Sequence, residues 1–100
     1  MSDNWPFDDP KNVATFTVRQ VTRDGNPILR VTHDRDECAW QFLEWVTPHE
    51  EDAMIVGLEE MTRIDPSIYE LADLPLGWRA IRRSPTEPWH REPNPNDGSS

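Results

Sequence analysis

The chain has 100 residues, a length that fits one domain, and 35% of them are hydrophobic, which allows a thin core. Its formal net charge of −9 argues against nucleic acid or an anionic membrane as a partner, because both attract basic surfaces. The single cysteine, Cys38, excludes an internal disulfide and fits a reducing compartment. No stretch resembles a secretory signal or a membrane span, so we expect a cytoplasmic protein.

Composition divides the chain into three parts. Residues 1–12 mix Pro, Asp and Asn around Trp5 and Phe7, and we expect an irregular N-terminal arm whose two aromatic rings dock on the domain. Regular patterns run through residues 13–92, which we interpret as a single α+β domain. Residues 93–100 contain no large apolar side chain, so this part is predicted to be a disordered tail.

Alternating apolar and polar residues predict the first strands. A period of two over residues 14–18 indicates a half-buried strand. Asp24-Gly25 follows and is typical of a hairpin turn, with a returning strand expected over residues 28–33. A second alternation over residues 38–42 suggests a short third strand.

The middle of the chain predicts a loop, a strand and one ambiguous segment. Residues 44–52 contain Pro48 and a run of acids, which favours a loop. Residues 53–56 form a continuous apolar run, which is consistent with a strand covered on both faces. Residues 58–64 fit either structure, since their apolar spacing suits a helical turn and their C-terminal end suits a strand.

The last third predicts a short helix and a final strand. Asp65-Pro66 favours a helix start, because Asp caps free amides and Pro is tolerated in the first turn. The helix should end before Leu74-Pro75, and a last strand is expected from Trp78 to Arg83. We therefore expect an α+β fold with a small, mostly antiparallel sheet of four or five strands and one short helix.

Few residue patterns point to catalysis or metal binding. Cys38 lies five residues after His33 and eleven before His49, so a thiol with a histidine base is one interpretation, and a small buried core cysteine is the simpler one. Two clusters could supply metal ligands: His33 with Asp34, Asp36 and Glu37, or Glu50, Glu51 and Asp52. Residues 34–37 lack the central glycine of a calcium loop, however, and solvated turns explain both clusters. We expect no enzymatic activity, no metal and no cofactor.

The negative charge is concentrated in the middle of the chain. Residues 34–73 hold 12 acidic and two basic residues, hence −10, and the other 60 residues carry +1. This segment could face a basic partner, or it could be a solvated surface that keeps the protein soluble. The candidate partner-binding residues are Asp34, Asp36, Glu37, Trp45, Glu50, Glu51 and Asp52.

The five tryptophans predict different roles. Trp40 and Trp78 lie inside alternating strand patterns, which favours core positions. Trp45 begins a polar loop, where an exposed aromatic ring beside acids is typical of an interface hot spot. Trp5 and Trp89 are expected to fix the two ends of the chain to the domain.

Several short phrases run through residues 5–90 in a recognisable order. They are Trp5-Pro6-Phe7, Pro27-Ile28-Leu29, Val31-Thr32-His33-Asp34, Trp40-Gln41-Phe42, Asp52-Ala53-Met54-Ile55-Val56-Gly57-Leu58, Asp65-Pro66-Ser67-Ile68, Leu74-Pro75-Leu76-Gly77-Trp78 and Pro88-Trp89. The ordered set resembles a bacterial family, formerly a domain of unknown function, that is grouped as immunity proteins of type thirty-three. The resemblance implies a small α+β domain assigned to neutralising toxins of polymorphic toxin systems, and it supplies no catalytic residues.

Charge and resemblance together favour a protein-binding function. We expect an immunity protein that neutralises a toxin by stoichiometric binding, and a basic toxin domain would suit the acidic middle of the chain. The alternative is a stand-alone regulatory or adaptor domain that binds another protein.

Overall fold

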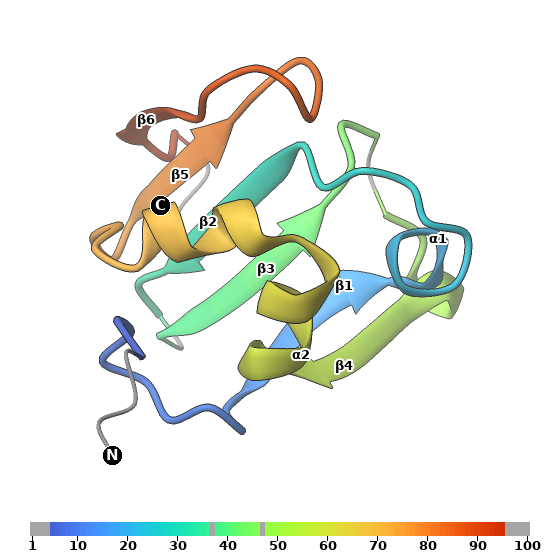
Figure 1. Ribbon diagram of the computed structural model, residues 1–100, viewed down its shortest axis with the longest axis horizontal. Coiled ribbons are helices and arrows are strands. Elements are labelled where there is room, and N and C mark those ends of the chain that lie inside the picture. The colour runs from blue at the N-terminus through green and yellow to red at the C-terminus, as the bar shows by residue number, and fades with distance from the viewer. Residues whose placement is uncertain (1–4, 37, 47, 96–100) are drawn as a thin grey trace.

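The computed structural model describes residues 5–36, 38–46 and 48–95, which form one six-stranded sheet with a helical layer on one face (Figure 1). The sheet order is β4-β1-β3-β2-β5-β6. The strands are β1 (Ala14–Val18), β2 (Arg30–Asp34), β3 (Ala39–Leu43), β4 (Ala53–Gly57), β5 (Trp78–Ile81) and β6 (His90–Pro93). Only the β1–β3 pairing is parallel among the described strands. The predicted α+β class and mostly antiparallel sheet are confirmed, with one strand more than expected.

Four short helical segments connect the strands. They are α1 (Arg19–Thr22), the 3-10 helix η1 (Glu50–Asp52), α2 (Leu58–Ile64) and the 3-10 helix η2 (Pro66–Leu71). The ambiguous segment 58–64 is therefore helical. The helix start after Asp65 is confirmed, because Asp65 Oδ1 accepts the Ser67 N–H at 3.0 Å and Pro66 occupies the first turn.

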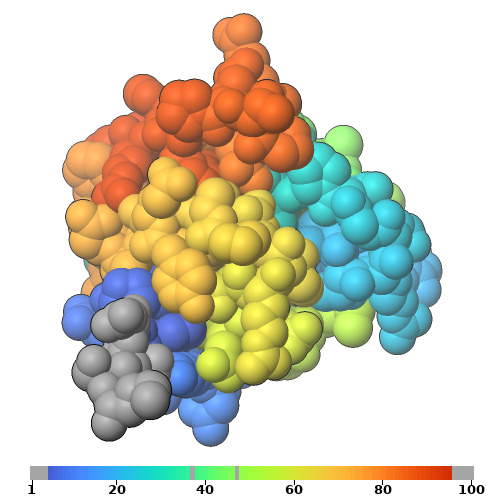
Figure 2. Space-filling model, viewed as in Figure 1, coloured from blue at the N-terminus to red at the C-terminus, as the bar shows by residue number. Residues whose placement is uncertain are grey.

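The hydrophobic core lies between the sheet and the segment that runs from α2 to Leu74. Trp40, Phe42, Val31 and Ala80 project from the sheet and are no more than 1% exposed. The core residues of the helical segment are Leu58, Met61, Ile68, Leu71 and Leu74. Figure 2 shows this segment from outside, spread across the centre of the molecule above the N-terminal residues.

The N-terminal arm docks as expected. Phe7 is buried, and its ring centroid lies 5.0 Å from that of Trp5 and 5.6 Å from that of Trp40. The Trp5 ring also meets Tyr69 of η2 edge-on at 6.1 Å. The arm therefore closes one side of the core with aromatic packing.

The predicted hairpin at Asp24-Gly25 is wrong. Gly25 does adopt a turn conformation, with φ of +76°, but β1 and β2 are not neighbours because β3 lies between them. The hairpin joins β2 to β3 instead, and Cys38 lies in its turn with φ of +53°. Cys38 is exposed there, so its expected place in the core is also wrong.

The apolar run 53–56 is not covered on both faces. It forms β4, which lies at the edge of the sheet, and Ile55 is 67% exposed. An apolar run indicates a strand, but it does not distinguish a central strand from an edge strand, because pairing depends on distant residues.

The C-terminal boundary also differs from the prediction. The unpredicted strand β6 pairs with β5 as far as Pro93, and the Asn94 N–H donates to the Gly77 carbonyl at 2.8 Å. Both residues fall in the segment that was expected to be a disordered tail, while residues 96–100 lie outside the described part. Strand β6 was not predicted from the sequence, because its pairing uses backbone groups and needs no apolar side chains.

Candidate functional site

One face of the sheet has no helical cover. Residues paired across neighbouring strands project to the same side, so the register places Ile55, Phe16, Gln41, Thr32 and Arg79 in one row. The helical layer packs on the opposite side (Figure 1). We call the side that carries this row the open face.

Strand β1 presents the open face with an inverted pattern. Its threonines point into the protein, where Thr15 and Thr17 are no more than 1% exposed, and its apolar residues Ala14 and Phe16 point outward. The buried Thr15 and Thr17 hydroxyls donate to the carbonyls of Val56 and Phe42 at 2.6 and 2.7 Å, which offsets the cost of their burial. No interaction of this kind offsets the cost of leaving the side chain of Phe16 in water, and this residue is 38% exposed. A single exposed apolar side chain is common on proteins, so the significance of Phe16 depends on whether its neighbours form a continuous apolar surface with it.

The apolar surface formed by the outward side chains of β1 and β4 extends onto the loop that follows β3. Phe16, Val18, Leu43 and Pro48 line a shallow hollow of about 280 Å³ on the open face, and Ile55 is the cross-strand partner of Phe16. The loop covers Val18 and Leu43 and exposes Val46, which is 68% exposed. We call the exposed residues of this set the apolar strip: Ile55, Phe16, Pro48 and Val46, with Val18 and Leu43 buried beneath them.

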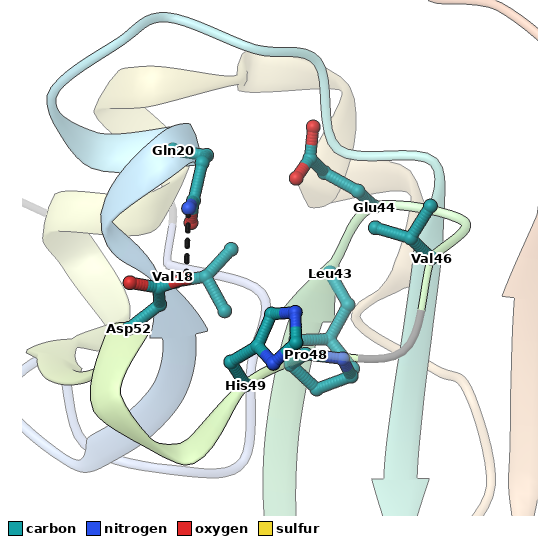
Figure 3. A pocket seen from close by; sticks show the side chains of 8 residues that line it. All are labelled: Val18, Gln20, Leu43, Glu44, Val46, Pro48, His49 and Asp52. Carbon is teal, nitrogen blue, oxygen red and sulfur yellow. Dashed lines mark hydrogen bonds between the residues drawn. The ribbon is translucent and has the colours of Figure 1, made fainter.

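A second, smaller hollow lies beneath the same loop (Figure 3). Figure 3 shows Gln20 and Asp52 on one side and Glu44 and Val46 on the other, with the His49 side chain also lining the space. Its volume of about 40 Å³ admits a few water molecules, whereas substrate pockets are several times larger. The hollow is therefore too small for a substrate, and the side chains that line it are placed to hold the loop against the domain.

Asp52 is the anchor of this loop. It is 8% exposed, its Oδ2 accepts the Gln20 amide at 2.9 Å, and its Oδ1 lies 2.7 Å from the Arg19 guanidinium. The Gln20 hydrogen bond lowers the pKa of Asp52 below its ordinary value of 3.8; Arg19 and His49 act in the same direction, and burial opposes them. Asp52 therefore contacts its own domain, so it is a poor candidate for contacting a partner.

This carboxylate should contribute to stability in a pH-dependent way. Because the pKa of Asp52 is lowered in the folded protein, its contribution is present above pH 4 and is lost as the pH falls through the folded pKa. We expect Asp52→Asn to be less stable than the wild type at pH 7, with a difference that shrinks below about pH 4. Urea unfolding measured from pH 7 to pH 2.5 tests this, with Glu51→Gln as the exposed neighbouring control. A pH-independent difference between Asp52→Asn and the wild type would contradict the assignment.

The other acidic candidates lie at two separate ends of the sheet. Asp34 ends β2 on the open face, where its Oδ2 accepts the Gln41 amide, and Asp36 is exposed in the following turn. Glu50 and Glu51 are exposed at the opposite end, immediately before β4, while Glu37 lies outside the described residues. The length of β3 separates the two ends by roughly 13 Å. The two acidic clusters therefore bracket the apolar strip and do not form a single patch.

Trp45 lies at the same end of the sheet as Glu50. Its ring is 44% exposed, and its indole N–H donates to the Arg82 carbonyl at 3.0 Å, which fixes the ring across the end of β5. It remains a candidate contact residue. The exposure of Phe16 and Ile55 was not predicted, because their local sequence patterns are those of buried strands, whereas Val46 lies in the segment that was predicted to be a loop.

The other half of the open face is charged. Arg79 forms an ion pair with Glu92, and Arg30 lies on the same face, where burial and then the charge of Arg79 lower its pKa. Two buried polar atoms here, Arg30 Nε and Thr32 Oγ1, have no hydrogen-bond partner among the described residues. The open face thus combines an apolar half with a polar half.

Comparison with known proteins gives no relative for this chain: no family model, no curated protein and no solved structure matches it. In the described part of the chain, no group of three or more His, Cys, Asp or Glu side chains is placed to hold a metal ion. None of the helices in the same part is long and apolar enough to cross a membrane.

Proposed function

We propose that this chain is a protein-binding domain that acts as an immunity protein, neutralising a toxin domain by stoichiometric binding. The observation that carries the proposal is the inverted strand β1, which buries Thr15 and Thr17 and exposes Phe16 beside Ile55. A purely structural strand with these residues would place Phe16 in the core. The choice of a toxin as the partner rests on the ordered phrases that resemble the type thirty-three immunity family.

The mechanism is steric blockade assisted by charge. The apolar strip supplies anchor side chains at the centre of an interface, and the acidic residues Asp36, Glu50 and Glu51 lie outside it at both ends. A net charge of −9 speeds the encounter with a basic toxin surface, because complementary fields steer association. We assign the protein to the cytoplasm, where an exposed thiol such as Cys38 stays reduced.

The proposal predicts a 1:1 partner that depends on Phe16. Wild-type protein captured from its native cells should retain a protein whose expression alone stops growth, and Phe16→Ser should weaken that complex at least about tenfold, the loss expected at a hot spot. Leu76→Ser is the matched control, because Leu76 is 39% exposed and Phe16 is 38% exposed. Calorimetric titration of the purified pair measures affinity and stoichiometry. Equal affinities of the two variants would contradict the assigned surface.

Two further outcomes separate the alternatives. Protection of cells at far less than one copy per toxin would indicate turnover, and stoichiometric inhibition would then be wrong. A stable 1:1 partner that is not toxic would favour the regulatory or adaptor domain. The double variant Glu50→Gln/Glu51→Gln should slow association and weaken its salt dependence with little change in dissociation, because exposed rim charges act mainly on the on-rate.

A further inference from the structure

Strand β4 leaves backbone groups unpaired along one edge. The Leu58 N–H donates to the Val13 carbonyl, and antiparallel hydrogen bonds alternate along the ladder, so Met54 and Val56 face β1 while Ala53, Ile55 and Gly57 face away. The Ala53 N–H caps η1, and the Gly57 carbonyl accepts the first bond of α2 as its N-cap. Four groups remain directed outward: the Ala53 C=O, the Ile55 N–H and C=O, and the Gly57 N–H. No strand among the described residues pairs with them.

The two edges of the sheet differ in how they are protected. The opposite edge, β6, is short, charged and bounded by Pro88, Pro93 and Pro95, which are features that blunt strand pairing. Strand β4 has the sequence Ala-Met-Ile-Val-Gly, without a proline or a charge. An apolar edge strand without such protection is a template for another strand, so β4 is the edge that is available for pairing.

The charges at the ends of β4 specify what can pair with it. Glu50 and Glu51 lie in η1, just before Asp52 and the strand, and Glu59 and Glu60 lie in the first turn of α2, just after Leu58. Glu59 and Glu60 also form long, exposed ion pairs with Lys11 and Arg63 at 3.6–3.7 Å, and pairs of this kind are weak enough for a cation of the partner to replace. In a symmetric antiparallel pairing of two copies about Ile55, η1 of each copy would approach the first turn of α2 of the other, and the acidic residues of these two segments would repel one another. An extended segment with basic residues at both ends would instead meet acids at both ends.

We propose that the free edge of β4 binds an extended segment of the partner protein by sheet extension, and that this segment is apolar at alternate positions and basic at both ends. The inference rests on the proposed function, since it assigns one recognition element to the same partner. The added strand bonds the four outward groups of β4 over five residues. Its alternate side chains extend the open face beside Ile55, so that the new strand and the apolar strip form one continuous surface.

A synthetic peptide tests the edge without knowledge of the partner. The probe is Arg-Lys-Val-Thr-Val-Thr-Val-Lys-Arg, added to 15N-labelled full-length protein, with binding followed by amide shifts and by fluorescence anisotropy. We expect saturable shifts at the Ile55 and Gly57 amides. The same core flanked by Glu and Asp should bind at least about tenfold more weakly, as should a peptide with N-methyl groups on alternate residues, because they remove charge complementarity and hydrogen bonds respectively.

Variants at position 55 distinguish binding through the backbone edge of β4 from binding through the side chains of the open face. Ile55→Pro removes the outward N–H without removing a β1–β4 bond, and should weaken peptide binding at least about tenfold. Ile55→Thr is the matched control that keeps the amide and the β-propensity, and should stay within about threefold of the wild type. If Ile55→Pro does not fold, Ile55→Lys serves in its place, because Ile55 is 67% exposed and an edge lysine repels a basic strand.

Three results would overturn the inference: no shifts at Ile55 and Gly57 at millimolar peptide, equal binding of the acidic peptide, or a dimer in sedimentation that Ile55→Lys dissociates. Toxin protection in cells is measured separately for wild type and Ile55→Pro. Peptide binding at β4 without any protection would reject the proposed function and leave the edge site standing. Full protection by Ile55→Pro would reject the edge as the partner's docking site and leave the proposed function standing.

Discussion

Replacing Trp40 with alanine is expected to lower the free energy of unfolding by about 3–5 kcal/mol. The ring is 1% exposed, stacks on His33 with centroids 3.9 Å apart, and packs edge-on against Phe7. Its indole N–H also donates to Asp9 Oδ2 at 2.7 Å, which ties the N-terminal arm to the sheet. Removing the ring leaves a cavity at the contact between β3, the arm and β2. Denaturant unfolding followed by circular dichroism measures the loss.

Two further variants test the reason for this effect. Trp40→Phe keeps a phenyl ring in the core but loses the bond to Asp9 and part of the indole volume, so it should cost about 1–3 kcal/mol, less than Trp40→Ala. Trp78→Ala should cost clearly less than Trp40→Ala, because Trp78 is only partly buried at the edge of the core. The expected core role of Trp78 is thus confirmed only in part. Equal losses at positions 40 and 78 would mean that burial does not determine the energetics here.

Replacing Arg82 with alanine is expected to cost about 3–5 kcal/mol, the range for breaking a buried ion pair from one side. Arg82 is 5% exposed, and its Nη2 lies 2.5 Å from Asp65 Oδ2. Its guanidinium also donates to the Ser67 hydroxyl and to the backbone carbonyls of Ile28 and Pro85. The Trp89 ring lies over it at 4.0 Å and donates its N–H to the same Ser67 hydroxyl. One side chain therefore joins the η2 cap, the segment before β2 and the C-terminal segment.

The neighbouring residue supplies the control for this prediction. Arg83→Ala removes the same charge from an exposed position and should change stability by less than about 0.5 kcal/mol. Arg82→Lys should recover little of the loss, because an ammonium group cannot reproduce the planar fork that reaches Asp65 and two carbonyls. Thermal and urea unfolding of the three variants decide between these effects. If Arg82→Lys matches the wild type, the network acts through charge alone.

Stability and recognition are separated on the two faces of the sheet. Trp40 belongs to the inner face, and Arg82 lies in the network that joins η2 to the sheet, while Phe16 and Ile55 of the open face add little to the core. Substitutions of the exposed residues Phe16 and Ile55 should consequently change binding more than folding. This separation makes the variants at positions 16 and 55 interpretable as tests of function.

Local chemistry allowed several features to be predicted from the sequence. The Asp65-Pro66 helix start depends on one side chain and one backbone amide, and both are present as expected. Trp5 and Phe7 dock because an apolar ring near a chain end gains free energy by leaving water. The period of two over residues 14–18 correctly indicated a strand. These features are determined within a few residues, so no knowledge of the rest of the fold was needed.

The features that define the candidate site were decided by tertiary structure alone. A period of two states that side chains alternate, but it does not state which side is covered, and in β1 the helical layer covers the threonines. The apolar run of β4 became an edge because β1 pairs with β3 on its other side, and the Asp24-Gly25 turn connects strands that are not neighbours. Pairing and layer order depend on contacts between residues far apart in the chain. For that reason the exposure of Phe16 and Ile55 could not be read from their local sequence.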